Sequence, residues 1–261
     1  MTPTEETYYR RYLNDIPFGG AQVQAIPYFP VLTFSDTATR ANGDLGNNWL
    51  TQGRPSSGSG GQECGCTINS NKFRFTAPIL GGNNNNPLNN VVWIPRQLIS
   101  TDPNTNLPGG IWTKNQYVNI TYQAVTTTSS CRIGVALHAK YDEGGSAGQA
   151  QAYHLIVHYN SGSFQAIDLI RTTGGENESG ATFSTLITSA VAPLAGDILE
   201  LDSLYNSGAT SVTLTYKKNG TQIFQYVDNS PLPQIGYPVM SFLTSLGNTT
   251  ADFTNFNCGN L

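Results

Sequence analysis

The sequence has few charged side chains and few histidines. Of its 261 residues, 13 are Lys or Arg, 17 are Asp or Glu and 3 are His, and the charged share of 11% is less than half of the usual ~25%. Coiled coils, helical bundles and charge-rich disordered chains need Glu, Lys and Arg in bulk, so this composition excludes them. A net charge of −4 leaves little to neutralise phosphates, which argues against nucleic-acid binding.

Long apolar runs and a basic leader are also missing. No stretch of ~20 apolar residues is present to span a membrane. Residues 1–6, MTPTEE, have neither a basic segment nor an apolar one, so we expect no secretory signal, synthesis in the cytoplasm and no association with a membrane.

Cysteine is scarce, with four residues: Cys64, Cys66, Cys131 and Cys258. They form no CxxC pairs, which disfavours a zinc site. Cys64 and Cys66 lie in a Gly-rich segment that is flexible enough to reach a distant partner. Two interpretations therefore stay open: free thiols in a protein made in a reducing cytosol, or a late disulfide to Cys258 or Cys131.

Short runs of alternating polar and apolar residues fill most of the chain. The clearest alternations lie in residues 117–125, 131–139 and 153–159. The 27 Gly and 14 Pro supply turn signals between the runs, and Asn219-Gly220 is the strongest hairpin signal. This pattern predicts an all-β protein, an antiparallel β-sandwich.

Residues 1–30 differ from the rest of the chain. Residues 2–5, TPTE, match a capping box with Pro at the first helical position, which predicts a short N-terminal helix followed by a Pro-containing extended arm. A helix this short is marginal alone in water, so its aromatic side must dock, either on this chain's own β-domain or on a neighbouring subunit. We therefore expect an anchoring segment at 1–30 and a β-sandwich domain at 31–261. The expected docking residues are Tyr8, Tyr9, Tyr12, Leu13, Phe18, Tyr28 and Phe29.

Histidines and exposed aromatics are the candidates for ligand binding. His154 and His158 lie ~13 Å apart if the segment is a strand, so they cannot share a metal ion. Both face away from the apolar side of their run, which predicts a polar or ligand-facing surface, with His138 in the same orientation on a neighbouring strand. Sugar sites need rings beside amides and carboxylates. The candidate glycan-binding residues are Trp112, Tyr141, Asp142, His138, His154 and His158.

No metal or cofactor is expected. Acidic pairs at 142–143 and at Glu176 and Glu178 sit in Gly-rich segments, but their spacing fits no calcium loop. No Gly-rich phosphate loop precedes a helix, which argues against a nucleotide enzyme.

Phe34 followed by residues 40–49, RANGDLGNNW, resembles the opening of concanavalin A-like (laminin G-like) jelly rolls of phage and bacterial surface proteins. Residues 196–201 and 213–220 are similar to a later strand entry and hairpin of that family, and residues 236–238 to a closing strand, although Val239 stands where the family commonly has Gly. The resemblance implies a concanavalin A-like jelly roll over residues 31–257. It also implies neighbouring first and last strands, which would place Phe34 near Phe253 and Cys64 or Cys66 near Cys258.

Two motifs suggest a catalytic site, but each lacks the neighbouring structure or residue that the chemistry requires. Residues 144–148, GGSAG, match a nucleophile elbow, but the motif needs a strand before it and a helix after it, and residues 149–159 favour a strand. Glu200 and Asp202 share a strand face, but the third acid that jelly-roll glucanases place on this strand is missing. We therefore expect no enzyme.

The resemblance implies surface display: glycan adhesion, decoration of a virion, or both. We expect a non-enzymatic structural, decoration or adhesion protein in the virion of a bacterial virus, with its jelly roll outward and residues 1–30 on other virion proteins. It would be a homo-oligomer or part of a larger assembly. The alternative is a lectin-like carbohydrate-binding module, or a weak glycanase, acting on host surface polysaccharide.

Overall fold

The structure, a computed structural model, describes ten stretches of the chain within the unit Val31–Leu261. These are residues 33–46, 49–52, 65–77, 89–95, 115–128, 130–140, 151–173, 182–234, 236–244 and 249–261. The predicted N-terminal helix and arm lie outside them, so the division at residue 30 stays a prediction. Among the described residues, no helix is long and apolar enough to cross a membrane.

All regular structure in the described residues is β-strand, arranged in two antiparallel sheets. Sheet A has nine strands in the order β14-β13-β12-β7-β16-β5-β4-β2, with β1 also paired to β16. Its strands are β1 (Thr33–Asp36), β2 (Gly43–Asp44), β4 (Gly65–Ile68), β5 (Phe73–Ala77), β7 (Gln116–Thr127), β12 (Ile198–Tyr205), β13 (Val212–Lys218), β14 (Thr221–Asp228) and β16 (Thr249–Asn260).

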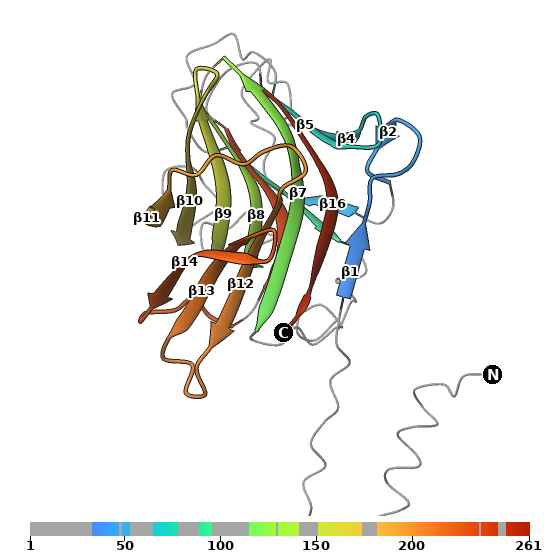
Figure 1. The fold of residues 1–261 in the computed structure, drawn as a ribbon. Helices are drawn as coiled ribbons and strands as arrows, with labels where there is room; N and C mark the ends of the chain where they lie inside the picture. Colours follow the sequence, from blue (N-terminus) through green and yellow to red (C-terminus); the bar gives the residue numbers. More distant parts are fainter. Residues whose placement is uncertain are drawn as a thin grey trace, which may run out of the picture. The chain divides into compact units, whose positions relative to one another are not determined.

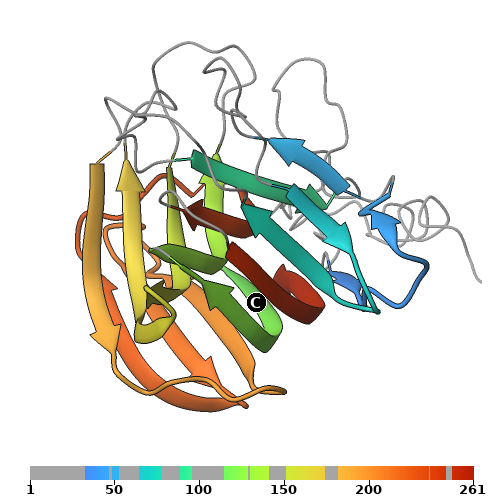
Figure 2. The same cartoon turned by 90° about the horizontal axis from the view of Figure 1, so that it is seen from above.

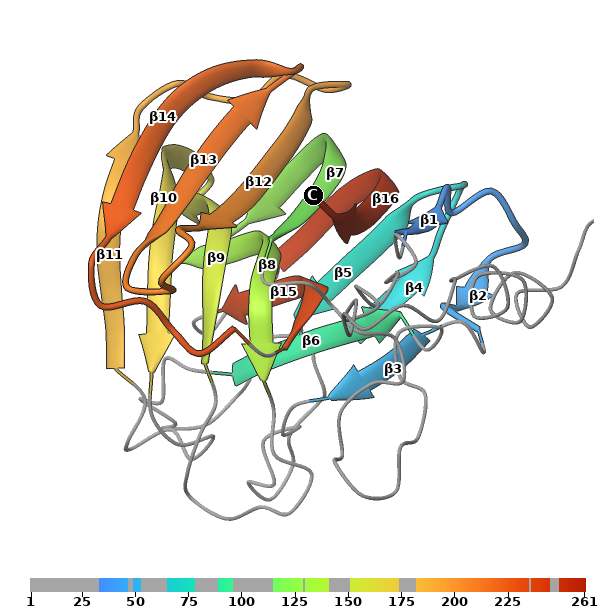
Figure 3. The same cartoon turned by 90° about the horizontal axis from the view of Figure 1, so that it is seen from below.

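Sheet B has seven strands in the order β11-β10-β9-β8-β15-β6-β3. Its strands are β3 (Trp49–Gln52), β6 (Asn89–Pro95), β8 (Cys131–Lys140), β9 (Gln151–Asn160), β10 (Ser163–Thr173), β11 (Thr182–Ser189) and β15 (Tyr237–Thr244). The sheets form two layers (Figure 1), and sheet A curves around one side of sheet B when the molecule is viewed along its strands (Figures 2 and 3). The predicted antiparallel β-sandwich is confirmed.

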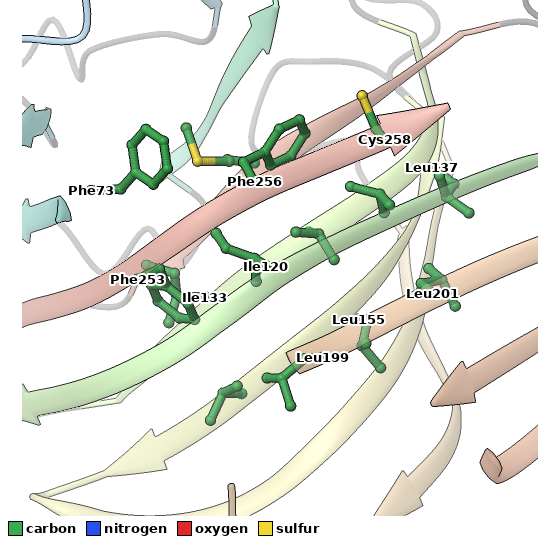
Figure 4. Close-up of a cluster of buried hydrophobic side chains, with 14 of the residues drawn as sticks. Phe73, Ile120, Ile133, Leu137, Leu155, Leu199, Leu201, Phe253, Phe256 and Cys258 are labelled. Carbon is green, nitrogen blue, oxygen red and sulfur yellow. The ribbon is translucent and has the colours of Figure 1, made fainter. Parts of the chain in front are cut away.

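The core lies between the sheets and follows the alternation in the sequence. Ile133 and Leu155 of sheet B face Ile120, Leu199 and Leu201 of sheet A (Figure 4), and all five are almost completely buried. Burying a side chain of this size stabilises the fold by about 1.5–3 kcal/mol. The alternation therefore decides which side of each strand is left to face outward.

The predicted hairpin at Asn219-Gly220 joins β13 to β14. Lys218 pairs with Thr221, so the connection has two residues. Asn219 has φ 52° and Gly220 has φ 76°, the left-handed conformations that a tight hairpin turn needs. Asn and Gly adopt them at the lowest cost, which is why this dipeptide is a strong signal.

The first and last described strands are neighbours, as the resemblance implies. Phe34 pairs with Cys258 across β1 and β16. The ring of Phe34 lies 6.1 Å from that of Phe256, whereas Phe253 packs on Phe75 at 5.8 Å. The expected ring neighbour of Phe34 was Phe253. Because Phe34 pairs with Cys258, Phe256, two residues away along β16, is the ring that reaches it.

Most of the motif after Phe34 builds one buried hydrogen-bond cluster. Arg40 Nη1 and Trp49 Nε1 each donate to the Asp36 carboxylate at 2.7 Å, and the Ala38 amide donates at 2.9 Å. Arg40 Nη2 also donates to the Leu45 carbonyl at 2.7 Å. Burial opposes ionisation of Asp36, but hydrogen bonds from Arg40 and Trp49 outweigh it and hold its pKa below the usual value. The motif therefore stabilises the fold through these hydrogen bonds.

Three described cysteines, Cys66, Cys131 and Cys258, are free and buried. Burial raises the pKa of the Cys66 and Cys258 thiols, so both are protonated at neutral pH. Cys64 lies outside the described residues.

Replacing Asp36 with Asn should destabilise the protein by about 2 kcal/mol, because Arg40 loses its counter-charge and one donor loses its acceptor. Urea unfolding followed by tryptophan fluorescence measures the effect. Asp44 is exposed, so Asp44→Asn is the matched control and should change the free energy of unfolding by less than about 0.5 kcal/mol. Equal effects of the two substitutions would contradict the structural role of the Asp36 cluster.

Candidate functional site

The outer face of sheet B, the side turned away from sheet A, is lined at its centre by small side chains. On β8 and β9, alternate residues fill the inter-sheet core, so Gly134, Ala136 and Ala152 lie on the outer face. A Cβ at Gly134 would stand 2.0 Å from the Leu155 carbonyl oxygen, so only glycine fits this approach of β8 to β9. Ala136 and Ala152 form a buried cluster separate from the main core. Small side chains on β8 thus lie beside a buried apolar cluster of Ile156, Ile170 and Phe183 on the same face.

His154 lies among these small residues, directly opposite Ala136. Its Nδ1 is 3.0 Å from the Ser241 hydroxyl, and its Nε2 is buried without a partner. Burial lowers the pKa of His154 to about 3, so the ring is neutral at ordinary pH. On β10, the Thr172 hydroxyl is also buried and unpartnered, and Thr172 pairs with Ala152. The face thus has two buried polar groups whose hydrogen-bonding capacity is unused.

A charged cluster lies further along the same face. His158 Nδ1 is 3.3 Å from Asp168 Oδ2, and the Thr188 hydroxyl donates to Asp168 Oδ1 at 2.9 Å. Arg132 stands directly opposite His158 on β8. Burial opposes ionisation of Asp168, but hydrogen bonds from His158 and Thr188 outweigh it and keep the pKa of this carboxyl below its usual value. Arg132 and His158 are partly exposed, so this end of the face is accessible.

The predicted orientation of His138 is wrong. The ladder between β8 and β9 is irregular from Leu137 to Lys140, and His138 has φ 53°. The irregularity turns the ring inward, where Nε2 lies 2.8 Å from the Ser203 hydroxyl of sheet A. The ring is fully buried against Tyr205, and burial lowers its pKa to about 3. His138 is therefore a core residue.

The expected accessible surface is also wrong for His154, which is fully buried, whereas His158 keeps a side-chain exposure of 20%. Trp112, Tyr141 and Asp142 lie outside the described residues, so their role stays a prediction. Sequence reasoning missed the polar partners on this face. Arg132 alternates with the core residues of 131–139, which was a usable signal. Asp168, Thr172 and Ser241 had none, because strand order brings them together.

The predicted carboxylate pair lies on the outer face of sheet A. Lys217 bonds to both Glu200, at 3.0 Å, and Asp202, and Asn119 Nδ2 donates to Glu200 at 3.0 Å. Burial raises the pKa of Asp202, with Glu200 adding to the effect and Lys217 opposing it. Glycoside hydrolysis needs two carboxyl groups about 5 Å or more apart with the sugar between them. Here the ammonium group of Lys217 binds both carboxylates, so they do not flank a space for a sugar.

The described residues contain no group of three His, Cys, Asp or Glu side chains that could hold a metal ion. No family model matches the sequence, and no curated protein matches it.

Solved structures share the fold. A non-specific endo-β-1,3(4)-glucanase from family GH16 is similar over 90% of this chain and 93% of its own, with 8% identity and a TM-score of 0.52. A prokaryotic β-1,3-1,4-glucanase (lichenase) from a mouse hindgut metagenome covers 88% and 99%, with 10% identity and a TM-score of 0.51. The CBM2 module of the evolved Dit of Lactobacillus casei BL23 phage J-1 covers 88% and 98%, with 7% identity and a TM-score of 0.46.

The chain therefore has a concanavalin A-like jelly-roll fold, as the sequence motifs indicate. Identities this low establish the fold alone. Enzymes have this fold, so it does not decide between catalysis and binding.

The two buried histidines make stability depend on pH. Their folded pKa of about 3 lies below the ordinary 6.5, so between these values the unfolded chain binds protons that the folded chain does not. Stability should therefore be full above about pH 6.5 and fall as the pH decreases, by about 2 kcal/mol per histidine between about pH 7 and about pH 5. Urea unfolding at both pH values measures this.

His154→Gln should remove about half of this pH dependence, because only His138 then remains. Carboxyl groups with lowered pKa values take up protons only at lower pH, so they do not change the free energy of unfolding in the range compared. A free energy of unfolding that is equal at the two pH values would show that the rings are not kept neutral by burial.

Proposed function

We propose that this protein is a non-enzymatic virion adhesion or decoration protein of a bacterial virus, whose jelly roll binds a carbohydrate on the outer face of sheet B. Residues 1–30 join it to neighbouring virion subunits. Glycan binding is the part that the described residues support directly, and the virion context rests on the sequence resemblance and the weakly charged, Thr- and Asn-rich composition.

One observation carries the binding proposal: unused hydrogen-bonding groups on the outer face of sheet B, next to a partly exposed Arg132 and His158. His154 Nε2, Thr172 Oγ1 and Arg132 Nε are all buried without a partner. Each such group costs about 1–3 kcal/mol, and proteins keep few of them outside functional places. Sugar hydroxyls donate and accept, so they match an imidazole nitrogen and a hydroxyl. His154 and Thr172 are buried, and His158 and Arg132 are the groups at the accessible end of this face.

The state of the carboxylates favours binding over hydrolysis. Asp36, Asp252 and Asp228 are paired with arginines at 2.7, 2.7 and 3.2 Å. Glu200 and Asp202 share Lys217. A general acid needs a carboxyl group aimed at substrate and opposite a second one, and these carboxyl groups instead neutralise neighbouring cations.

A glycan array tests the binding proposal with the full chain. Binding above background to at least one host-type surface glycan is expected, and Trp112→Ala or Tyr141→Ala should weaken it if those rings stack on the sugar. Lys72→Ala, on the sheet A side of the sandwich, is the control. Release of reducing sugar from the bound polysaccharide would replace this proposal with a glycanase.

Removing residues 1–30 tests the anchoring proposal. The shortened chain should keep the β-sheet circular dichroism of the parent and lose incorporation into particles, because the aromatic side chains of the arm are the proposed contact. Replacement of Tyr8, Tyr9 and Tyr12 with Ser should have the same effect without shortening the chain. Incorporation at the parental level would refute the anchoring role.

A further inference from the structure

Arg132 differs from the other described arginines in having no ion pair. Arg40, Arg74 and Arg171 each lie within 2.7 to 3.2 Å of a carboxylate oxygen. Within the part of the chain that the structure describes, Arg132 makes no hydrogen bond or ion pair, and its Nε is buried without an acceptor. Its terminal nitrogens are not among the buried unpartnered atoms, so they reach solvent on the outer face of sheet B. A partly buried guanidinium group is thus left without a hydrogen-bonded carboxylate.

Asp168 compensates the charge of Arg132 only at longer range. The charge of Arg132 helps to lower the pKa of Asp168, but Arg132 makes no hydrogen bond or ion pair to it, and the two Asp168 oxygens instead contact His158 and Thr188. His158 stands directly opposite Arg132, so the neighbour across the strand is a second nitrogen-rich group. Arg132 and His158 together therefore present donors toward the same part of the face.

We propose that the carbohydrate bound on this face is acidic, and that a carboxylate on one of its sugars binds Arg132 beside His158. This inference rests on the proposed carbohydrate function and names its substrate class. The planar guanidinium group offers parallel N–H donors that match the two oxygens of a carboxylate. The protein's net charge is −4, so this attraction is local to Arg132 and does not come from an overall positive field.

A sugar acid fits this face better than an acidic peptide. His158, directly opposite Arg132, is partly exposed and can contact a hydroxyl next to the carboxylate, whereas His154 and Thr172 are buried further along the strands and take no part in this contact. A uronic or sialic acid residue within a glycan has a carboxylate and several hydroxyls in one rigid unit. An acidic peptide has carboxylates on flexible side chains and loses more conformational entropy on binding.

An array of carboxylated glycans tests the inference. Each glycan is printed as the free acid and as its methyl ester, beside neutral glycans and poly-glutamate, and probed with the full chain. The free acid should bind and the methyl ester should not. Arg132→Gln should weaken binding of the acid about 10- to 100-fold, the effect of one charge-assisted contact, and Arg132→Lys should restore part of it.

Arg74→Gln is the matched control. It removes the same charge from the sheet A side of the sandwich, where Asp252 keeps Lys72 at 3.8 Å, and should leave glycan binding unchanged. Arg132→Gln should lower the unfolding midpoint less than Arg74→Gln, because Arg132 has only a longer-range interaction with Asp168 whereas Arg74 is ion-paired to Asp252, so a loss of binding by Arg132→Gln alone would not reflect misfolding.

The outcomes separate this inference from the function on which it rests. Binding of acid and ester alike, or of neutral glycans only, or unchanged binding by Arg132→Gln, overturns the acidic ligand and leaves the carbohydrate function in place. Binding of poly-glutamate without any glycan overturns both in favour of an acidic peptide. Binding of no probe also overturns both.

Discussion

Apolar side chains from two sheets must meet between them, and a strand turns successive side chains to opposite sides. In β8, β9 and β10 the residues that fill the core commit their neighbours to the outer face of sheet B. His154, His158 and Arg132 lie there because Leu155, Val157 and Ile133 are buried on the other side. The position of the proposed binding face thus follows from how the core is packed.

The same geometry explains how the few charged side chains of this protein are paired. Most described carboxylates lie within reach of a cation, and several of these pairs join segments that are distant in the chain, such as Arg74 with Asp252 and Arg171 with Asp228. Partly buried charges need such partners, because leaving water costs them solvation. Arg132, which has no ion pair among the described residues, is the exception on which the proposal of an acidic ligand rests.

Irregularities in the ladders decided the exceptions to simple alternation. His138 was expected on the outer face, and a register shift in β8 turned it into the core, where it bonds to Ser203. Bulges of this kind reverse the facing of the residues beyond them, and alternation in a sequence carries no sign of where they fall.

The fold class and the Asn219-Gly220 hairpin were determined by the sequence itself, because alternation and turn chemistry act over a few residues, whereas the pairing of the first and last described strands was expected only from the family resemblance. The opening motif could be recognised, but not that Arg40 and Trp49 meet on Asp36. Only the tertiary structure decided that Asp168, Thr172 and Ser241 share a face with His154 and His158, and that Arg132 is unpaired. Those facts depend on strand order and register, which bring together residues far apart in the chain through backbone hydrogen bonds that are the same for every sequence.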